Sequence, residues 1–159
     1  MSQLSNVSQK IKVYIGSDHG GFLMKEKIKK NNELNSFIDF IDVGTYSEDS
    51  VDYPDYAKKI ANKVLENKES YGIGICGTGI GICIALNKIK GIYAANVNKV
   101  IEAELAKEHN NVNVITLSGR FSTVDENIAI IKKFFASNFQ KGRHEQRLEK
   151  IKKMEEENE

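Results

Sequence analysis

The stretch Tyr71-Gly72-Ile73-Gly74-Ile75-Cys76-Gly77-Thr78-Gly79-Ile80-Gly81 decides the fold of this chain. Its apolar first half predicts a buried strand that ends at a cysteine and a glycine-rich turn. The glycines allow a tight turn in which backbone N–H groups converge, and the apolar segment after them predicts a helix whose positive dipole end faces the same point. Both effects favour the thiolate of Cys76 and would stabilise an anion beside it.

Two other interpretations of this stretch remain open. Cys76 could be a small buried hydrophobic residue, which is the commonest fate of a free cysteine. Gly72, Gly74 and Gly77 have the spacing of a dinucleotide-binding fingerprint, but they fall within the predicted strand rather than after it. The next strand leads into Ala95-Asn96-Val97-Asn98 without the acidic residue that a ribose would need, so the dinucleotide interpretation is weak.

Outward from this stretch, short runs rich in Ile and Val alternate with longer segments of helical period, which predicts strand–helix units and a parallel sheet. Strands are expected at 11–16, 37–43, 71–75, 91–95 and 112–117. Helices are expected at 21–31, 55–67, 79–87, 99–108, 124–139 and 143–154. Right-handed crossovers would place helices on both faces of the sheet, so we expect a Rossmann-like α/β fold with five parallel strands.

The composition predicts a single globular domain. Of the 159 residues, we assign 11–154 to that domain, 1–10 to a polar N-terminal extension and 155–159 to a charged C-terminal tail. A net charge of +1 argues against a general nucleic-acid binder, and no apolar run approaches the roughly 20 residues that cross a membrane. The two cysteines make neither a disulfide framework nor a zinc spacing, so we expect a reducing, cytoplasmic setting.

Ligands of such a sheet bind beyond the carboxyl ends of its strands. The loops expected there gather four reactive or charged groups on one rim: Asp18, His19, Cys76 and Arg120. Considered singly, Asp18 is better explained as a helix cap and His19 as a surface residue. The prediction of a site therefore depends on their convergence.

His109 and Asn110 come at the opposite edge of the sheet, at the end of a helix and just before the fifth strand. A strand of five or six residues spans roughly 17 Å, so His109 cannot easily reach Cys76 of its own chain. If both residues serve one site, that site is shared between two subunits and the protein is at least a dimer. The alternative is that His109 and Asn110 only end the helix.

Arginine use points to a phosphorylated small molecule. The chain has 20 lysines but three arginines: Arg120 on the expected rim, and Arg143 and Arg147 one helical turn apart. Arginine resists replacement by lysine where a planar fork grips a phosphate or carboxylate at two points. The alternative is surface ion pairs with Glu145 or Glu149, typically worth about 0–1 kcal/mol each.

Six blocks of these residues, in order, resemble the type B ribose-5-phosphate isomerases, which are grouped with the galactose-6-phosphate isomerase subunits. The blocks are Gly16-Ser17-Asp18-His19-Gly20-Gly21-Phe22, Asp52-Tyr53-Pro54-Asp55-Tyr56-Ala57, Cys76-Gly77-Thr78-Gly79-Ile80-Gly81, His109-Asn110, Gly119-Arg120 and Gly142-Arg143-His144-Glu145-Gln146-Arg147. The resemblance spans about residues 11–154. It implies a three-layer α/β/α sandwich and a homodimer whose active sites combine residues of both subunits.

The resemblance also implies the reaction, an aldose–ketose isomerisation of the pentose phosphate pathway. D-ribose 5-phosphate and D-ribulose 5-phosphate would interconvert through a cis-enediolate, without a metal or an organic cofactor. By the same resemblance, the Cys76 thiolate moves the proton between C2 and C1 while Thr78 hydrogen-bonds the oxygens. Backbone N–H groups of Gly77, Gly79 and Gly81 would stabilise the enediolate.

The remaining roles implied by the resemblance concern the sugar ring and the phosphate. Asp18 and His109 would open the furanose ring, without a clear division of labour between them. Asn110 and Tyr53 would orient the sugar. Four side chains would hold the phosphate, with His144 nearby: His19, Arg120, Arg143 and Arg147.

Three rival functions remain. Isomerases of six-carbon phosphosugars act on allose 6-phosphate or galactose 6-phosphate, but the galactose enzymes divide the motif between two chains, whereas it is complete here. A non-catalytic phosphosugar or nucleotide sensor would keep Arg143 and Arg147 without needing Cys76. A thiol-redox protein would need Cys83 as a resolving partner. Cys83 has no role in the resemblance, and its place on an apolar helix face predicts core packing.

Overall fold

A five-stranded sheet forms the centre of the chain, in a computed structural model that describes residues 9–158. The strands are β1 (Ile11–Ser17), β2 (Ile38–Asp42), β3 (Tyr71–Cys76), β4 (Ala94–Asn96) and β5 (Val114–Ser118), in the spatial order β2-β1-β3-β5-β4. Every neighbouring pair is parallel, which confirms the predicted fold class. The predicted extension at 1–10 lies outside the described residues, except for residues 9 and 10.

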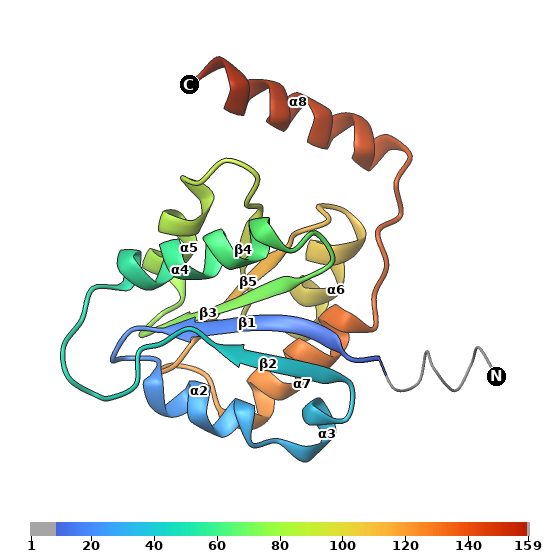
Figure 1. Cartoon of the computed structure of the whole chain (residues 1–159). Helices are drawn as coiled ribbons and strands as arrows, with labels where there is room; N and C mark the ends of the chain where they lie inside the picture. The colour runs from blue at the N-terminus through green and yellow to red at the C-terminus, as the bar shows by residue number, and fades with distance from the viewer. Residues whose placement is uncertain (1–8, 159) are drawn as a thin grey trace.

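Helices cover both faces of the sheet (Figure 1). One face carries α4 (Tyr53–Glu66) and α5 (Ile80–Asn87). The other face carries α2 (Phe22–Lys29), α3 (Asn32–Asn35), α6 (Val100–Glu108) and α7 (Val124–Phe135). These layers make the α/β/α sandwich that the resemblance implied. The last helix, α8 (Arg143–Glu157), stands apart from both layers.

The side chains of β1 show why both faces need a cover. Val13 and Ile15 are fully buried in the core beneath α2 and α7, whereas Tyr14 lies in the core beneath α4. A parallel strand that is buried on both faces is apolar along most of its length, which is the pattern that the sequence shows. In α4, the buried residues recur at helical spacing: Ala57, Ile60, Ala61 and Val64.

The fourth strand is shorter than predicted. Of the expected range 91–95, only the last part is a strand, because Gly91 has a positive φ of 90° and side chains bind the backbone next to it. The Asn113 side chain donates to the Gly91 carbonyl (2.9 Å) and accepts from the Tyr93 N–H (2.9 Å). The Asn87 side chain likewise donates to the Ala94 carbonyl (2.9 Å) and accepts from its N–H (2.8 Å).

Three predicted helices also differ in their ends. The expected helix at 21–31 ends at Lys29 as α2, and a short helix that was not predicted, α3, follows it; the Asn31 side chain caps α3 by accepting from the Leu34 N–H (2.9 Å). The expected helix at 124–139 ends at Phe135, where Ser137 Oγ donates to the Lys133 carbonyl (2.8 Å). α8 continues to Glu157, past its expected end at 154 and into the predicted tail.

None of the helices within residues 9–158 is both long enough and apolar enough to cross a membrane.

Candidate active site

The predicted site residues form two groups at opposite edges of the sheet. We call the group at the carboxyl ends of the strands the thiol rim: Asp18, His19, Tyr53, Cys76, Thr78 and Arg120, with Gly77, Gly79 and Gly81. We call the group beside the amino ends of β4 and β5 the arginine edge: His109, Asn110, Arg143, His144 and Arg147. Cys76 is the last residue of β3, whereas His109 follows α6 and precedes β5. The predicted separation of these two residues within one chain is therefore confirmed.

The Cys76 thiol lies at the start of α5. Its Sγ accepts a hydrogen bond from the Gly79 N–H (3.2 Å), and Gly79 is the N-cap of α5 with a positive φ of 82°. The neighbouring Thr78 Oγ1 accepts from the Ile80 N–H (3.1 Å). The Cys76 side chain also packs into the core beneath α4 and α5 and is only 4% exposed in the single chain. The hydrogen bond from the Gly79 N–H agrees with the interpretation of Cys76 as a site for an anion, and its burial agrees with the interpretation as a packed thiol.

The end of β5 and the loop after it are hydrogen-bonded to the turn that follows Cys76. The Gly119 N–H donates to the Cys76 carbonyl (2.9 Å), and the Arg120 N–H donates to the Gly77 carbonyl (3.1 Å). Ser118 Oγ donates to the same Gly77 carbonyl (2.7 Å) and accepts from the Phe121 N–H (2.9 Å). The sequence analysis missed this role of Ser118, which stands directly before Gly119-Arg120 at the end of a buried strand.

The Arg120 guanidinium lies between two glycine turns. A Cβ at Gly77 would lie 3.2 Å from Arg120 Nη1, and a Cβ at Gly20 would lie 3.3 Å from Nη2. The glycines therefore allow the guanidinium to lie close to both backbones. Gly20 directly follows His19, so Arg120 lies against the backbone next to His19.

Asp18 and His19 are each held by backbone groups. Asp18 is 7% exposed, and its Oδ1 accepts from the Gly21 N–H (3.1 Å) in the turn before α2, whose N-cap is Gly21 and not Asp18. His19 Nδ1 lies 3.1 Å from the backbone nitrogen and 3.2 Å from the carbonyl oxygen of Val51. Because Nδ1 faces the backbone, Nε2 is the ring nitrogen left for a ligand.

Tyr53 joins the thiol rim from α4, of which it is the first residue. Its ring lies directly over Gly81 in the first turn of α5, where a Cβ would be only 2.6 Å from Tyr53 Cζ. Gly81 is thus required by close contact with an aromatic ring. The contact brings the phenol to the same helix start that holds Cys76.

The arginine edge is organised around two stacked histidine rings. His109, the C-cap of α6, stacks on His144 of α8 with ring centroids 4.2 Å apart and an angle of 13° between the planes. Burial lowers the pKa of His144, and the neighbouring charges of His109, Arg143 and Arg147 lower it further. Asn110, Arg143 and Arg147 are exposed in the single chain, so their side chains are free to meet another surface.

Cys83 lies on α5 in a half-buried position rather than in the core. Its Sγ is 3.6 Å from the Ala94 carbonyl oxygen, and burial raises the pKa of its thiol. A thiol held in its protonated form is a poor nucleophile, which argues against the thiol-redox function.

A large cavity of this chain lies outside the predicted site. The cavity of about 1150 Å³ lies at the amino ends of β1 and β3, where it is lined by Lys12, Tyr71 and Lys107 among others, and it includes no residue of the thiol rim or the arginine edge. Within residues 9–158, no three His, Cys, Asp or Glu side chains are grouped so that they could hold a metal ion.

Comparison with known proteins gives concordant matches over nearly the whole chain. Residues 13–151 match the sequence model of the ribose/galactose isomerase family. The chain is 36% identical over 140 residues to the ribose-5-phosphate isomerase B of Escherichia coli strain K12, covering 88% of this chain and 93% of that protein.

Solved structures give the same result. A ribose-5-phosphate isomerase B from Clostridium thermocellum has a TM-score of 0.89 and 39% identity, with 94% of this chain and all of that chain covered. A ribose-5-phosphate isomerase B from Mycoplasma genitalium, crystallised with bound ribulose 5-phosphate, has a TM-score of 0.87 and 42% identity, with coverage of 94% and 99%.

Proposed function

The chain belongs to the ribose/galactose isomerase family as a type B ribose-5-phosphate isomerase, and from this premise we propose that it interconverts D-ribose 5-phosphate and D-ribulose 5-phosphate. The enzyme class, a sugar-phosphate isomerase, follows from the family. We propose, beyond this class, that ribose 5-phosphate is the substrate and that the residues of the thiol rim and the arginine edge act on it. The observation that carries it is the Cys76 Sγ, held by the Gly79 N–H at the start of α5.

Cys76 is the proposed base. A hydrogen bond from a backbone N–H and the positive end of a helix dipole both favour a thiolate at this place. The thiolate takes the proton from C2 of the open-chain aldose, which leaves an enediolate, and returns that proton to C1 to give the ketose. Thr78, beside it, hydrogen-bonds the two oxygens between which the hydroxyl proton moves, and the N–H groups of Gly77, Gly79 and Gly81 stabilise the enediolate.

The phosphate is proposed to be held by side chains of both groups, the thiol rim and the arginine edge. His19 and Arg120 both belong to the thiol rim, where Arg120 lies against Gly20, the residue after His19. Arg143 and Arg147 lie exposed on α8, one helical turn apart, and can add two guanidinium groups that bind the phosphate. Asp18 and His109 divide the opening of the furanose ring, and Tyr53 and Asn110 orient the sugar.

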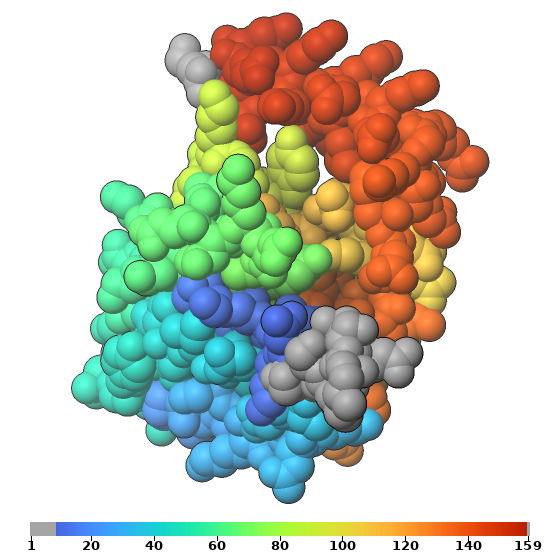
Figure 2. Space-filling model, turned by 45° about the vertical axis from the view of Figure 1, so that its right-hand side comes forward, coloured from blue at the N-terminus to red at the C-terminus, as the bar shows by residue number. Residues whose placement is uncertain are grey.

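Because the two edges lie apart in one chain, we propose a homodimer in which the arginine edge of one subunit completes the thiol rim of the other. α8 projects as a ridge above the body of the chain (Figure 2). Ile80 and Ile84 on α5 are 53% and 58% exposed, and Met154 on α8 is 60% exposed. Such apolar surface next to a site is typical of an interface between subunits.

The experiment that tests the substrate is a comparison of kcat/KM for ribose 5-phosphate, allose 6-phosphate and galactose 6-phosphate. We expect ribose 5-phosphate to rank first, which would place the reaction among pentose phosphate conversions. A higher value for a six-carbon substrate would overturn the substrate assignment while leaving the enzyme class intact. Binding of all three without turnover would instead support a phosphosugar sensor.

A further inference from the structure

One lysine of α2 is completely buried. Lys25 has no exposed side-chain surface, and its Nζ donates to both carboxylate oxygens of Asp42 (2.6 Å each) and to the Thr45 carbonyl (2.7 Å). The three N–H bonds of its ammonium group therefore have three oxygen acceptors. A buried lysine needs such partners, because an unpaired charge inside a protein is costly.

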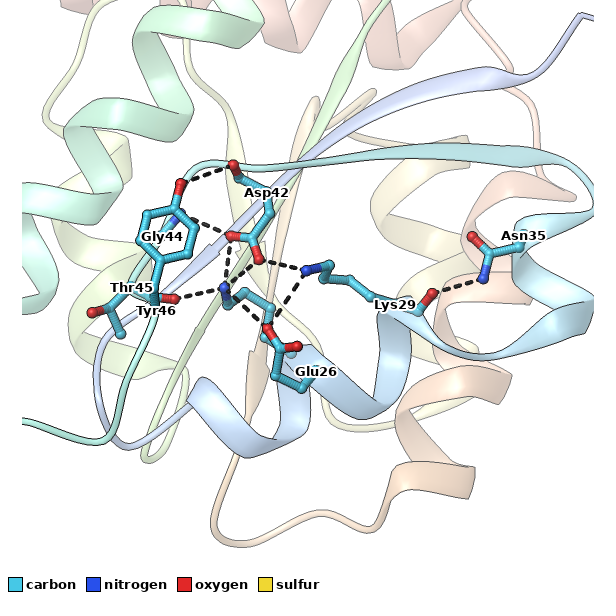
Figure 3. A network of polar contacts seen from close by, with 8 residues as sticks. Glu26, Lys29, Asn35, Asp42, Gly44, Thr45 and Tyr46 are labelled. Atoms are coloured by element: carbon cyan, nitrogen blue, oxygen red, sulfur yellow. Dashed lines mark hydrogen bonds and ion pairs between the residues drawn. The ribbon is translucent and has the colours of Figure 1, made fainter.

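Asp42, at the end of β2, is the centre of this cluster (Figure 3). Its carboxylate also accepts from Lys29 Nζ (2.7 Å) and from the Gly44 N–H (2.8 Å). Burial works against its charge, but the hydrogen bonds from Lys25, Lys29 and Gly44 outweigh that effect and lower the pKa of Asp42. Asp42 is therefore ionised at neutral pH and holds both lysines.

The two lysines differ in what they reach. Lys29 is 29% exposed at its side chain and binds Asp42 and Glu26. Lys25 binds Asp42 as well, but it also reaches the backbone of Thr45, in the loop that joins β2 to α4. Of these two lysines, Lys25 is the one that donates a hydrogen bond from α2 to that loop. The pair offers a natural control, since both lysines share one carboxylate partner.

The β2–α4 loop contacts the thiol rim at both of its ends. At its start, the Ser17 N–H donates to the Gly44 carbonyl (2.7 Å) and the Thr45 N–H donates to the Ser17 carbonyl (2.8 Å), directly before Asp18-His19. At its far end, the backbone of Val51 contacts His19 Nδ1. The position of this loop therefore decides how the His19 ring is oriented.

We propose that Lys25, together with Asp42, is a positioning residue that fixes the β2–α4 loop so that Val51 directs His19 Nε2 toward the substrate phosphate. The inference rests on the proposed phosphate-binding role of His19. His19 is covalently followed by α2, which carries Lys25, and its ring is held by the loop that Lys25 anchors. Lys25 thus connects α2, which follows His19 in the chain, with the loop whose Val51 backbone contacts the His19 ring.

The test is a double-mutant cycle between Lys25→Met and His19→Ala, with the KM for ribose 5-phosphate and the inhibition constant of inorganic phosphate as readouts. We expect Lys25→Met to raise both constants about tenfold with kcat within about threefold, and His19→Ala to do the same. In the His19→Ala background, Lys25→Met should add less than about twofold, because the two residues act through one contact. Lys29→Met, the matched control, should stay within about twofold of the unmodified enzyme.

Stability is measured on every variant by thermal unfolding. If Lys25→Met does not fold, Lys25→Met/Asp42→Asn replaces it in the cycle, because it removes both charges of the buried pair. An unchanged KM in the folded variant, or effects of Lys25 and His19 that simply add, would overturn the positioning role. If His19→Ala itself leaves the KM and the phosphate inhibition unchanged, the phosphate role of His19 fails first, and the inference falls with it.

Discussion

The thiol rim and the arginine edge are held in contrasting ways. The rim is fixed within one chain by hydrogen bonds from Gly79 to Cys76 Sγ and from the Gly119 and Arg120 N–H groups to the turn after Cys76. The arginine edge depends on one stacked pair of imidazoles and leaves its arginines exposed. A single chain therefore fixes the surroundings of the proposed base, whereas the arginines proposed to bind the phosphate are left exposed to another surface.

The largest effect should come from the reacting group of the rim. Cys76→Ala removes the proposed base, and we expect kcat with ribose 5-phosphate to fall about 10³-fold or more, since positioned acid–base groups contribute on the order of 10²–10⁴. The KM should stay within about tenfold, because the phosphate contacts remain. Steady-state kinetics measures both.

Cys83→Ser is the matched control for that experiment. Cys83 is the other thiol of α5 and lies outside the rim, so activity should change less than about twofold. Turnover that survives in Cys76→Ala would remove the thiol from the mechanism, and a large loss in Cys83→Ser would revive the redox function.

The arginine edge can be tested by mixing subunits. The variant Arg143→Ala/Arg147→Ala should lose about 100-fold in kcat/KM, because two charge-assisted forks to a phosphate are removed. Equimolar co-expression with Cys76→Ala should then restore about a quarter of the unmodified activity, since half of the dimers are mixed and each contains one intact site.

The mixing experiment separates two arrangements. If the arginines act on Cys76 of their own chain, each subunit of a mixed dimer is still defective and no activity returns. That outcome would contradict the shared site. Mixing Cys76→Ala with Arg120→Ala is the control, because both residues belong to the rim of one chain.

A smaller effect should come from the contact between Tyr53 and α5. Gly81→Ala places a Cβ in the space of the Tyr53 ring and should push the phenol away from the rim, which raises the KM about fivefold or less. In a Tyr53→Ala background the same substitution should have almost no further effect. An equal loss in both backgrounds would mean that the added Cβ acts by disturbing the start of α5 and not by displacing the Tyr53 ring.

The smallest effect concerns pH. The pKa of His144 is lowered in the folded chain, so the unfolded chain binds more protons below the ordinary histidine range near 6.5, and folding stability should fall as the pH drops from about 7 toward 5. Thermal unfolding against pH checks this. His144→Gln should flatten that part of the curve, and an unchanged slope would exclude His144 as the source.

The sequence predicted the rim better than the edge because the rim depends on local features. The turn after Cys76 follows from its glycines and from the apolar strand before it, and parallel strands bring their carboxyl ends together whatever the loops contain. The stacking of His109 on His144 depends instead on the path of the segment before α8, where the Gln140 N–H donates to the Glu108 carbonyl (2.9 Å). The local sequence around His109 and His144 does not predict that their rings stack.

Lys25 shows a different limit. On a helix with Lys27 and Lys29 close by, another lysine is expected to face solvent, and Asp42 lies far along the chain at the end of the next strand. Only the pairing of β1 with β2 brings that carboxylate beneath α2. The fourth strand was predicted, but its shortness was not, since the amide of Asn113 replaces ladder hydrogen bonds before Ala94.

The Asn87 side chain has a further consequence at β4, which is one of the two border strands of the sheet. Its carboxamide binds both the N–H and the carbonyl of Ala94 and so imitates the backbone of an additional strand. Border strands with free backbone groups recruit other chains and promote aggregation. The Asn87 side chain therefore occupies the backbone groups of Ala94 that another chain would need for strand pairing. Growth of the sheet from one molecule into the next is opposed there by a side chain instead of by a strand.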